Sequence, residues 1–249
     1  MGLLGPDGVR DGPRTGQGIL SSAPGAVEEG SPGWEDRRVH PWTVVLPLKG
    51  GPAAKSRLGA GPDLAAAVAA DTLDAVLACR VVGAVVVVTA DGATAAAARA
   101  AGALVTRERR PGAGLVEAVR DGVEQAARRP GPAAVLLGDL PALRPDDLAE
   151  ALRAAARALR RRPARAMAAV PDADGTGTVL LAARAAADLD PAFGPDSLAA
   201  HVRRGAVRLD LDLPRLRRDV DTPADLAEAL ALGAGPRTVA LADRARGRV

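Results

Sequence analysis

The run AVVVVT at residues 84–89 constrains the fold more than any other part of this chain. It is apolar without interruption and rich in valine, and Asp91 and Gly92 directly after it favour a turn. A strand that is apolar at every position is typical of a parallel sheet covered on both faces, whereas a half-exposed strand alternates apolar and polar residues. Residues 84–89 therefore predict an interior strand of an α/β fold.

Comparable apolar segments recur along the chain, separated by segments with helical periodicity. We expect strands at residues 43–48, 84–89, 103–106, 133–137, 165–170 and 179–182, and an edge strand at 207–213. We expect helices at residues 62–80, 93–101, 115–129, 145–162, 198–204 and 223–232. This alternation predicts an α/β fold with a largely parallel sheet.

The 249 residues are expected to form one domain between an N-terminal extension and a C-terminal tail. Residues 1–40 are rich in Gly, Pro, Ser and charge without hydrophobic periodicity, which predicts a disordered N-terminal extension. Residues 41–233 carry the alternating pattern and predict a single domain. Residues 234–249 are expected to form a basic C-terminal tail of no evident role.

Composition argues against two classes of partner. The formal net charge is +3, and the chain has one Phe, two Trp and no Tyr. Proteins that stack nucleic-acid bases need aromatic side chains within a basic surface, so we expect no nucleic-acid partner. No apolar run reaches the roughly 18 residues of a membrane span, and the first residues lack a secretory pattern. The single cysteine, Cys79, lies in an apolar helical pattern, which predicts a buried thiol and a cytoplasmic protein.

The loop after the first strand holds both lysines of the chain, Lys49 and Lys55, although Lys and Arg together number 33. Lysine presents a compact ammonium group, whereas arginine presents a planar fork. Together with Ser56, Arg57 and a Gly/Pro backbone, the lysines predict a polyphosphate site at the end of a strand. The other interpretation is a solvated loop in which both lysines fall by chance.

Carboxylates stand at two further positions that local structure does not explain. Asp139 follows the strand at 133–137, at the carboxyl end where open α/β sheets bind ligands. Asp219 and Asp221 are two residues apart on an extended segment, so their side chains point to the same side. Carboxylates in this arrangement suit a hard cation.

Three loops offer groups for an anion, and each also has a structural interpretation. The basic loop 107–114 would hold an anion or a nucleoside at the start of a helix, or would form a solvated turn. The Gly/Thr loop 171–178 begins like a calcium loop but has Ala183 at the position of the last ligand, so its amides and hydroxyls better suit a phosphorylated acid. Ser197 would cap the helix at 198–204 or bind an anion, and His201 on that helix is expected to be a surface or packing residue.

Four segments, LPLKGGPAAKSRLG, LLGDLPAL, PDADGTGTVLL with FGPDS, and RDVDTPADL, occur in the order and spacing of one family. Over residues 42–232 the chain resembles the phosphoenolpyruvate or 2-phospho-L-lactate guanylyltransferases of coenzyme F-420 biosynthesis. The resemblance implies the nucleotide-diphospho-sugar transferase fold, a mixed, mostly parallel sheet with helices on both faces. It also implies that GMP passes from GTP to the phosphate of phosphoenolpyruvate, with Mg²⁺ as cofactor and pyrophosphate as the second product.

The same resemblance implies the residue roles. The phosphoenolpyruvate-type substrate would be bound by Thr178, Gly194 and Ser197, with Thr176 or Val179 as other candidates for the role of Thr178. The Mg²⁺ ligands would be Asp139 with Asp219 or Asp221. The triphosphate would be bound by Lys49, Lys55, Ser56 and Arg57, and the catalytic residues would be Lys49, Lys55, Arg57 and Asp139.

Several alternatives stay open at this point. The acceptor could be 2-phospho-L-lactate or 3-phosphoglycerate, and the enzyme could be a sister nucleotidyltransferase of the molybdenum-cofactor or sugar-phosphate type. Sister enzymes typically carry a GxGxR-type loop, from which residues 49–52 depart. A nucleotide sensor without activity is opposed by the presence of Asp139, Asp219 and Asp221, and a dinucleotide-binding oxidoreductase by the lack of GxGxxG. Expected partners are GTP, phosphoenolpyruvate and the next transferase of the pathway, and the oligomeric state stays open.

Overall fold

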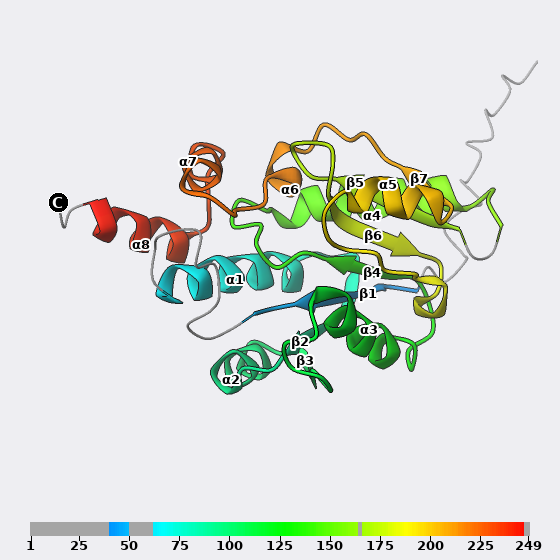
Figure 1. The fold of residues 1–249 in the computed structure, drawn as a ribbon, viewed down its shortest axis with the longest axis horizontal. Helices are drawn as coiled ribbons and strands as arrows, with labels where there is room; N and C mark the ends of the chain where they lie inside the picture. The colour runs from blue at the N-terminus through cyan, green and yellow to red at the C-terminus, as the bar shows by residue number, and fades with distance from the viewer. Residues whose placement is uncertain (1–39, 50–61, 164–165, 247–249) are drawn as a thin grey trace, which may run out of the picture. The chain divides into compact units, whose positions relative to one another are not determined.

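The apolar runs of the sequence form the strands of a central sheet. The computed structural model describes residues 40–49, 62–163 and 166–246. Within these residues seven strands form one sheet in the order β3-β2-β1-β4-β6-β5-β7 (Figure 1). The strands are β1 (Trp42–Pro47), β2 (Val82–Thr89), β3 (Leu104–Arg107), β4 (Ala133–Leu136), β5 (Met167–Pro171), β6 (Thr178–Ala183) and β7 (Ala206–Arg208). The helices are α1 (Pro62–Leu77), α2 (Gly92–Ala100), α3 (Leu115–Ala126), α4 (Pro145–Leu159), η2 (Ala186–Asp188), α5 (Ser197–Arg203), α6 (Pro214–Arg217), α7 (Pro223–Ala231) and α8 (Pro236–Arg246).

One strand of the sheet, β6, runs against the direction of the others. β1 pairs in parallel with β2 and β4, and β2 pairs in parallel with β3. β6 is antiparallel to both β4 and β5, and β7 is parallel to β5. The expected mixed, mostly parallel sheet is confirmed. Because β6 runs against β4, it begins at the edge of the sheet where β4 ends.

Each interior strand divides its side chains between two hydrophobic cores. On β1, Val44 and Leu46 face one helical layer and Val45 faces the other, and all three are fully buried. The same alternation holds along β2, β4 and β5, and along β6 from Leu180 onward. Helices α1, α2 and α4 cover the first face, and α3 and α5 cover the second. Burial on both faces explains why these strands are apolar at every position.

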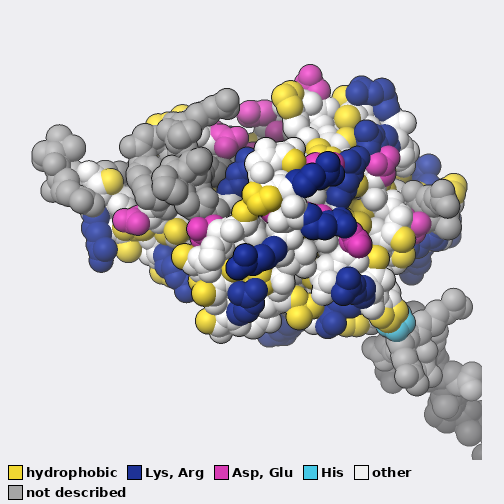
Figure 2. Space-filling view, turned by 60° about the horizontal axis from the view of Figure 1, so that its bottom comes forward, with side chains coloured by type: hydrophobic (Ala, Val, Ile, Leu, Met, Phe, Trp, Pro, Cys, Tyr) yellow, Lys and Arg dark blue, Asp and Glu magenta, His cyan; other side chains and the backbone are white. Residues whose placement is uncertain are grey.

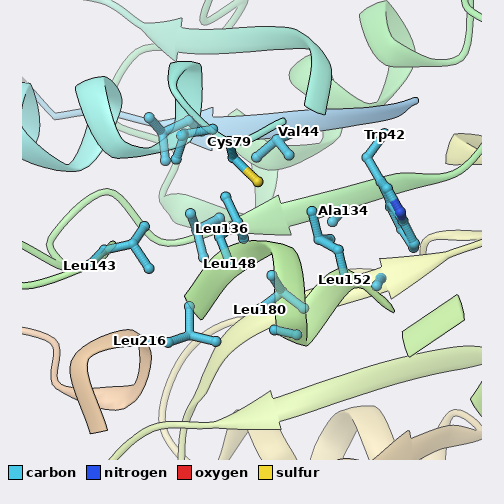
Figure 3. Packing of buried hydrophobic residues seen from close by; sticks show 14 of the residues in the cluster. Trp42, Val44, Cys79, Ala134, Leu136, Leu143, Leu148, Leu152, Leu180 and Leu216 are labelled. Carbon is cyan, nitrogen blue, oxygen red and sulfur yellow. The ribbon is translucent and has the colours of Figure 1, made fainter. Parts of the chain in front are cut away.

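Figure 3 shows part of the first core, where side chains from β1, β4 and β6 meet those of the helices. Cys79, just after α1, points into this core and is 2% exposed. Burial raises the pKa of its thiol. Cys79 therefore serves as a small apolar side chain, as its sequence pattern predicts.

The C-terminal segment, expected to be a basic tail of no evident role, contains a helix. Residues Pro236–Arg246 form α8, which packs against α1 (Figure 1). The side chain of Asp71, in α1, is 2% exposed and accepts hydrogen bonds from the backbone N–H groups of Arg237 (3.3 Å) and Thr238 (2.8 Å). A buried carboxylate far away in the sequence therefore caps α8, and the composition of the segment itself does not reveal this.

The expected edge strand at residues 207–213 is shorter in the structure. β7 covers only Ala206–Arg208, although it does pair with β5 at the edge of the sheet. Beyond it, Leu209 and Leu211 pack against the first core and Leu213 is buried in it. The leucines turn the chain inward, so the alternating pattern reflects burial rather than continued pairing.

Charges of both signs share the surface. Figure 2 shows Lys and Arg side chains distributed over the visible face, with Asp and Glu side chains among them. Ion pairs such as Arg204 with Asp190 and Arg208 with Asp210, both 2.7 Å, follow this pattern. Across the described ranges, no helix combines the length and the apolar character needed to cross a membrane.

Candidate active site

A cavity of about 860 Å³ opens at the carboxyl ends of the parallel strands. Its walls include residues that follow β1, β2, β3 and β4, which is where open α/β sheets bind ligands. The start of β6 joins them because Leu137, after β4, donates its N–H to the carbonyl oxygen of Val179 (2.9 Å). The strand reversal therefore places Thr178, the first residue of β6, at the same edge.

Seven acidic residues of the described ranges line this cavity, and four of them lie after β4, after β5 and between α6 and α7. Asp139 follows β4, Asp172 follows β5, and Asp219 and Asp221 come from the segment between α6 and α7. The backbone joins two of these segments, because the N–H of Val220 donates to the carbonyl oxygen of Asp139 (3.0 Å). Burial, followed by the charges of Asp139 and Asp172, raises the pKa of Asp219 to about 7. Negative charge is therefore concentrated where these segments meet.

This carboxylate group fits a hard divalent cation. Mg²⁺ is usually held by one or two carboxylates together with substrate phosphates, not by a complete protein cage. Among the described residues, no three His, Cys, Asp or Glu side chains form such a cage. Burial and repulsion from neighbouring carboxylates raise the pKa of Asp219 because they destabilise its charged form. A bound cation would stabilise that charged form. Asp139 and Asp219 are the residues that fit this role, whereas Asp221 is exposed.

Gly138 lets the chain after β4 approach the end of β1. A Cβ at this position would lie 2.3 Å from Leu48 Cδ2 and 2.8 Å from the Pro47 carbonyl oxygen, so a larger residue does not fit. Lys49 follows directly on β1, is exposed, and lines the same cavity as Asp139. The close approach of two adjacent strand ends therefore brings a lysine and a carboxylate to one cavity.

The remaining members of the expected triphosphate site, Lys55, Ser56 and Arg57, lie outside the described residues.

The three residues expected to bind the acid all line the cavity. Thr178 and Ser197 are each 2% exposed, and Gly194 lies in the loop before α5 with a φ of 143°. Of the other candidates for the role of Thr178, Thr176 also lines the cavity. Val179 does not, because its side chain is fully buried in the first core.

Helix α5 begins one residue earlier than expected. Ser197 is its first residue, and the cap position is held by Asp196 in the left-handed conformation (φ 52°) without a side-chain hydrogen bond to the helix. The expected capping role of Ser197 is therefore wrong, because its backbone is already helical. Its N–H donates to the carbonyl oxygen of Gly194 (3.2 Å), which closes the loop before the helix.

His201 has a more specific place than a surface or packing residue. It is fully buried, its Nδ1 lies 2.9 Å from Thr178 Oγ1, and its Nε2 accepts the N–H of Ala192 (2.9 Å). The ring of Phe193 meets it edge-on, with ring centres 5.0 Å apart. Burial, helped by the charge of Arg204, lowers the pKa of His201 to about 4, so the ring is neutral near pH 7.

Asp172 is a cavity residue that the sequence pattern did not reveal. Its carboxylate accepts the backbone N–H groups of Thr176 (3.0 Å) and Gly177 (2.8 Å). The amides that we expected to face a substrate are therefore used within the loop itself. The position of Asp172 in the sequence could have indicated its place in the cavity, because Asp172 directly follows β5 just as Asp139 closely follows β4.

The other side of the cavity is formed by residues after β2 and β3. From the loop 107–114, Gly112 (φ 85°) and Gly114 (φ 102°) line the cavity. The neighbouring Arg109 and Arg110 instead pair with carboxylates of α3, the former with Asp121 at 2.5 Å. The arginines therefore hold the loop against α3, and glycine backbone forms this part of the wall.

Comparison with known proteins shows the family to which the chain belongs. The family described as "MobA-like NTP transferase domain" matches residues 64–219. A phosphoenolpyruvate guanylyltransferase of Salinispora arenicola is 53% identical over 206 residues, covering 80% of this chain and 92% of the relative. The Streptomyces coelicolor protein of the same name is 48% identical over 212 residues, covering 82% and 96%.

Solved structures support the fold assignment. A nucleotidyl transferase from Methanothermobacter aligns with a TM-score of 0.56 at 20% identity, covering 77% of this chain and 97% of its own. The 4-diphosphocytidyl-2C-methyl-D-erythritol synthase of Anaerococcus prevotii aligns with a TM-score of 0.51 at 10% identity, covering 77% and 97%. The carboxylate-lined cavity, the nucleotidyltransferase fold and the sequence identity together show that this chain belongs to the MobA-like NTP transferases and, within them, to the phosphoenolpyruvate guanylyltransferase family.

Proposed function

We propose that this enzyme transfers GMP from GTP to the phosphate of phosphoenolpyruvate in the presence of Mg²⁺. The products are enolpyruvyl-diphospho-guanosine and pyrophosphate, and the route served is coenzyme F-420 biosynthesis. One observation carries the proposal: Lys49, Asp139, Asp219, Thr178 and Ser197, which come from distant parts of the sequence, line a single cavity. The names of relatives with about half of their residues identical support the choice of nucleotide and acceptor.

The reaction joins two anions. An oxygen of the acceptor phosphate attacks the α-phosphorus of GTP, a new P–O bond forms, and the bond from the α-phosphorus to the bridging oxygen breaks to release pyrophosphate. The acceptor oxygen is already ionised near neutral pH, so no general base is required. The chain must chiefly position the two phosphates and neutralise their charge.

Two kinds of group would neutralise the charge of the phosphates: basic side chains and a divalent cation. Lys49 would interact with the triphosphate, and Lys55, Ser56 and Arg57 of the loop after it would act in the same way. Asp139 and Asp219 would hold Mg²⁺, with Asp221 as the other candidate ligand. A divalent ion there would neutralise phosphate oxygens as charge moves onto the leaving pyrophosphate.

The order of the strands supports a division of the cavity into two halves. The nucleoside would lie over the ends of β2 and β3, against Gly112 and Gly114. The acid would lie beside the start of β6, where Thr178, Gly194 and Ser197 line the cavity. The carboxylate of Asp139 follows β4, which lies between β1 and β6 in the sheet. The reacting phosphates would therefore meet next to the cation.

The decisive experiment measures pyrophosphate release in a grid of substrates. GTP, ATP and CTP are each offered with phosphoenolpyruvate, 2-phospho-L-lactate and 3-phosphoglycerate, with Mg²⁺ or with a chelator. Turnover confined to GTP with phosphoenolpyruvate and Mg²⁺ is the expected result. Turnover with another acid would show that phosphoenolpyruvate is not the specific acceptor. Turnover with another nucleotide would show that GTP is not the specific donor.

Product removal is part of this design, because we propose that the product passes to the next transferase of the pathway. The grid is therefore repeated with that transferase present. If every combination stays inactive in both series, the proposed function is wrong.

The role of Lys55, which lies outside the described residues, is tested by Lys55→Ala. The variant is expected to bind GTP more weakly while its affinity for the acid stays the same, because an ammonium group placed at the triphosphate would not contact the acid. Calorimetric titration of each substrate measures the difference. Unchanged GTP affinity would remove Lys55 from the triphosphate site.

A further inference from the structure

His201 links the two elements that carry the acid-binding residues. From α5 it reaches Thr178 Oγ1 on β6 through Nδ1 and the backbone N–H of Ala192 through Nε2, each at 2.9 Å. The loop that starts at Ala192 continues to Gly194 and Ser197, which line the cavity. A single buried ring therefore contacts both parts of the proposed acid site.

The contacts determine which nitrogen of the ring carries the proton. The N–H of Ala192 can only donate, so Nε2 must accept and must be unprotonated. The neutral ring then has its proton on Nδ1, and burial keeps the ring neutral at physiological pH. Nδ1 must therefore donate to the hydroxyl oxygen of Thr178.

The direction of the hydrogen bond between His201 and Thr178 determines whether Thr178 can donate to an anion. A threonine hydroxyl has one hydrogen to donate, and it accepts through its lone pairs. Since His201 occupies a lone pair, the hydroxyl hydrogen of Thr178 stays available, and Thr178 lines the cavity. In the other tautomer, Thr178 would donate to the ring and turn only lone pairs toward an anionic substrate.

The ring also fixes the loop before α5. The Ala192 hydrogen bond and the edge-on contact with Phe193 hold residues 192–193. Leu198 N–H, one turn away from His201 on α5, donates to the carbonyl oxygen of Thr176 (3.1 Å) and ties the helix to the chain before β6. The acid site therefore depends on how α5 is seated.

We infer that His201 is a positioning residue, which presents the hydroxyl of Thr178 as a hydrogen-bond donor to the phosphorylated acid and fixes the loop that carries Gly194 and Ser197. This inference rests on the proposed function for the identity of the acid, but not for the direction of the hydrogen bond. Two measurements separate these parts.

The first measurement reads the tautomer in the unliganded wild-type protein. Long-range ¹H–¹⁵N NMR distinguishes protonated from bare imidazole nitrogens, and spectra of His201→Asn assign the signals, since the chain has only two histidines. We expect a protonated Nδ1 and a bare Nε2 at pH 7.5. A protonated Nε2 would overturn the inference, whatever the enzyme turns over.

The second measurement compares two conservative variants. The amide nitrogen of Asn overlays Nδ1 and can still donate to Thr178, whereas the amide of Gln overlays Nε2 and can only keep the bond to Ala192. We expect His201→Gln to raise the KM for phosphoenolpyruvate about 10- to 100-fold, the loss expected for a hydrogen bond to a charged group. His201→Asn should stay within about 3-fold of wild type, a change of less than 1 kcal/mol. The KM for GTP should not change in either variant.

Matched controls make the result specific. Val202→Ala alters the neighbouring residue of α5, which is 44% exposed, and should leave both KM values unchanged. In a Thr178→Val background, His201→Gln should add little further loss, because both changes remove the same donor. Equal KM values for phosphoenolpyruvate in the Asn and Gln variants, or fully additive losses, would overturn the inference. An inactive wild type would instead contradict the proposed function.

Discussion

Acidification gives a quantitative test of the buried state of His201. In an unfolded chain the imidazole has a pKa of 6.5, whereas burial lowers the pKa to about 4 in the folded protein. Below pH 6.5 the unfolded chain therefore takes up a proton that the folded protein refuses. The stability contributed by this group is complete above pH 6.5 and is lost as the pH falls toward 4.

The two pKa values set the magnitude. At pH 5 the histidine of the unfolded chain is almost fully protonated, while about one folded molecule in ten carries the proton. The free energy of unfolding should therefore fall by about 2 kcal/mol through His201 alone between pH 7.5 and pH 5. The loss should approach about 3 kcal/mol below pH 4, where both states are protonated.

Urea titrations at pH 7.5 and pH 5.0 measure this loss, followed by circular dichroism and by the fluorescence of Trp42, which is 4% exposed. The wild type is compared with His201→Asn, which cannot take up a proton. Asp219 contributes with the opposite sign, because its raised pKa favours proton uptake by the folded protein, and it is common to both proteins. The wild type should lose about 2 kcal/mol more than the variant. Parallel losses in the two proteins would refute the neutral, buried assignment of His201.

Three further changes test other parts of the structure. Asp71→Asn should lower the free energy of unfolding by about 1–3 kcal/mol in urea titration, because an amide cannot accept both N–H bonds of α8. The control Asp74→Asn changes an exposed position and should cost less than about 0.5 kcal/mol. Asp139→Asn should reduce kcat about 100-fold or more while the thermal unfolding midpoint is retained, and near-normal turnover would exclude a role for this carboxylate. Gly138→Ala should lower both stability and turnover, since its methyl group meets Leu48, and a fully active, stable variant would contradict the close approach.

Much of the fold could be predicted because its signals are local. The valine run that became β2 and the apolar run that became β4 are buried on both faces, and this leaves a continuous apolar signature. The position of Asp139 followed from the same logic, because the residues after a parallel strand lie at the ligand-binding edge. Local periodicity therefore sufficed for the sheet and for one carboxylate of the site.

The remaining features depend on contacts between distant parts of the chain. Helix α8 is capped by Asp71, which lies 166 residues away from Arg237 in the sequence. The local sequence around either residue does not predict this contact. His201 looks like an ordinary helical residue until β6 and the loop before α5 are folded around it. The loop that contains Asp172 was expected to offer its amides to a substrate, whereas the carboxylate of Asp172 accepts two of these amides within the loop. Hydrophobic periodicity predicts local elements, but it does not predict which side chains far apart in the sequence will contact each other.

The reversed direction of β6 has a consequence for how such enzymes change specificity. One wall of the cavity is formed by loop and helix residues that precede Ala133, and another by residues of the continuous segment 172–197. Under the proposed function, the acid would bind at this uninterrupted segment, so a few substitutions or an insertion there would change the acid that is accepted. The first wall and the carboxylate after β4 would be left intact. Under the proposed function, the residues that bind the donor and those that bind the acceptor would therefore be able to change independently.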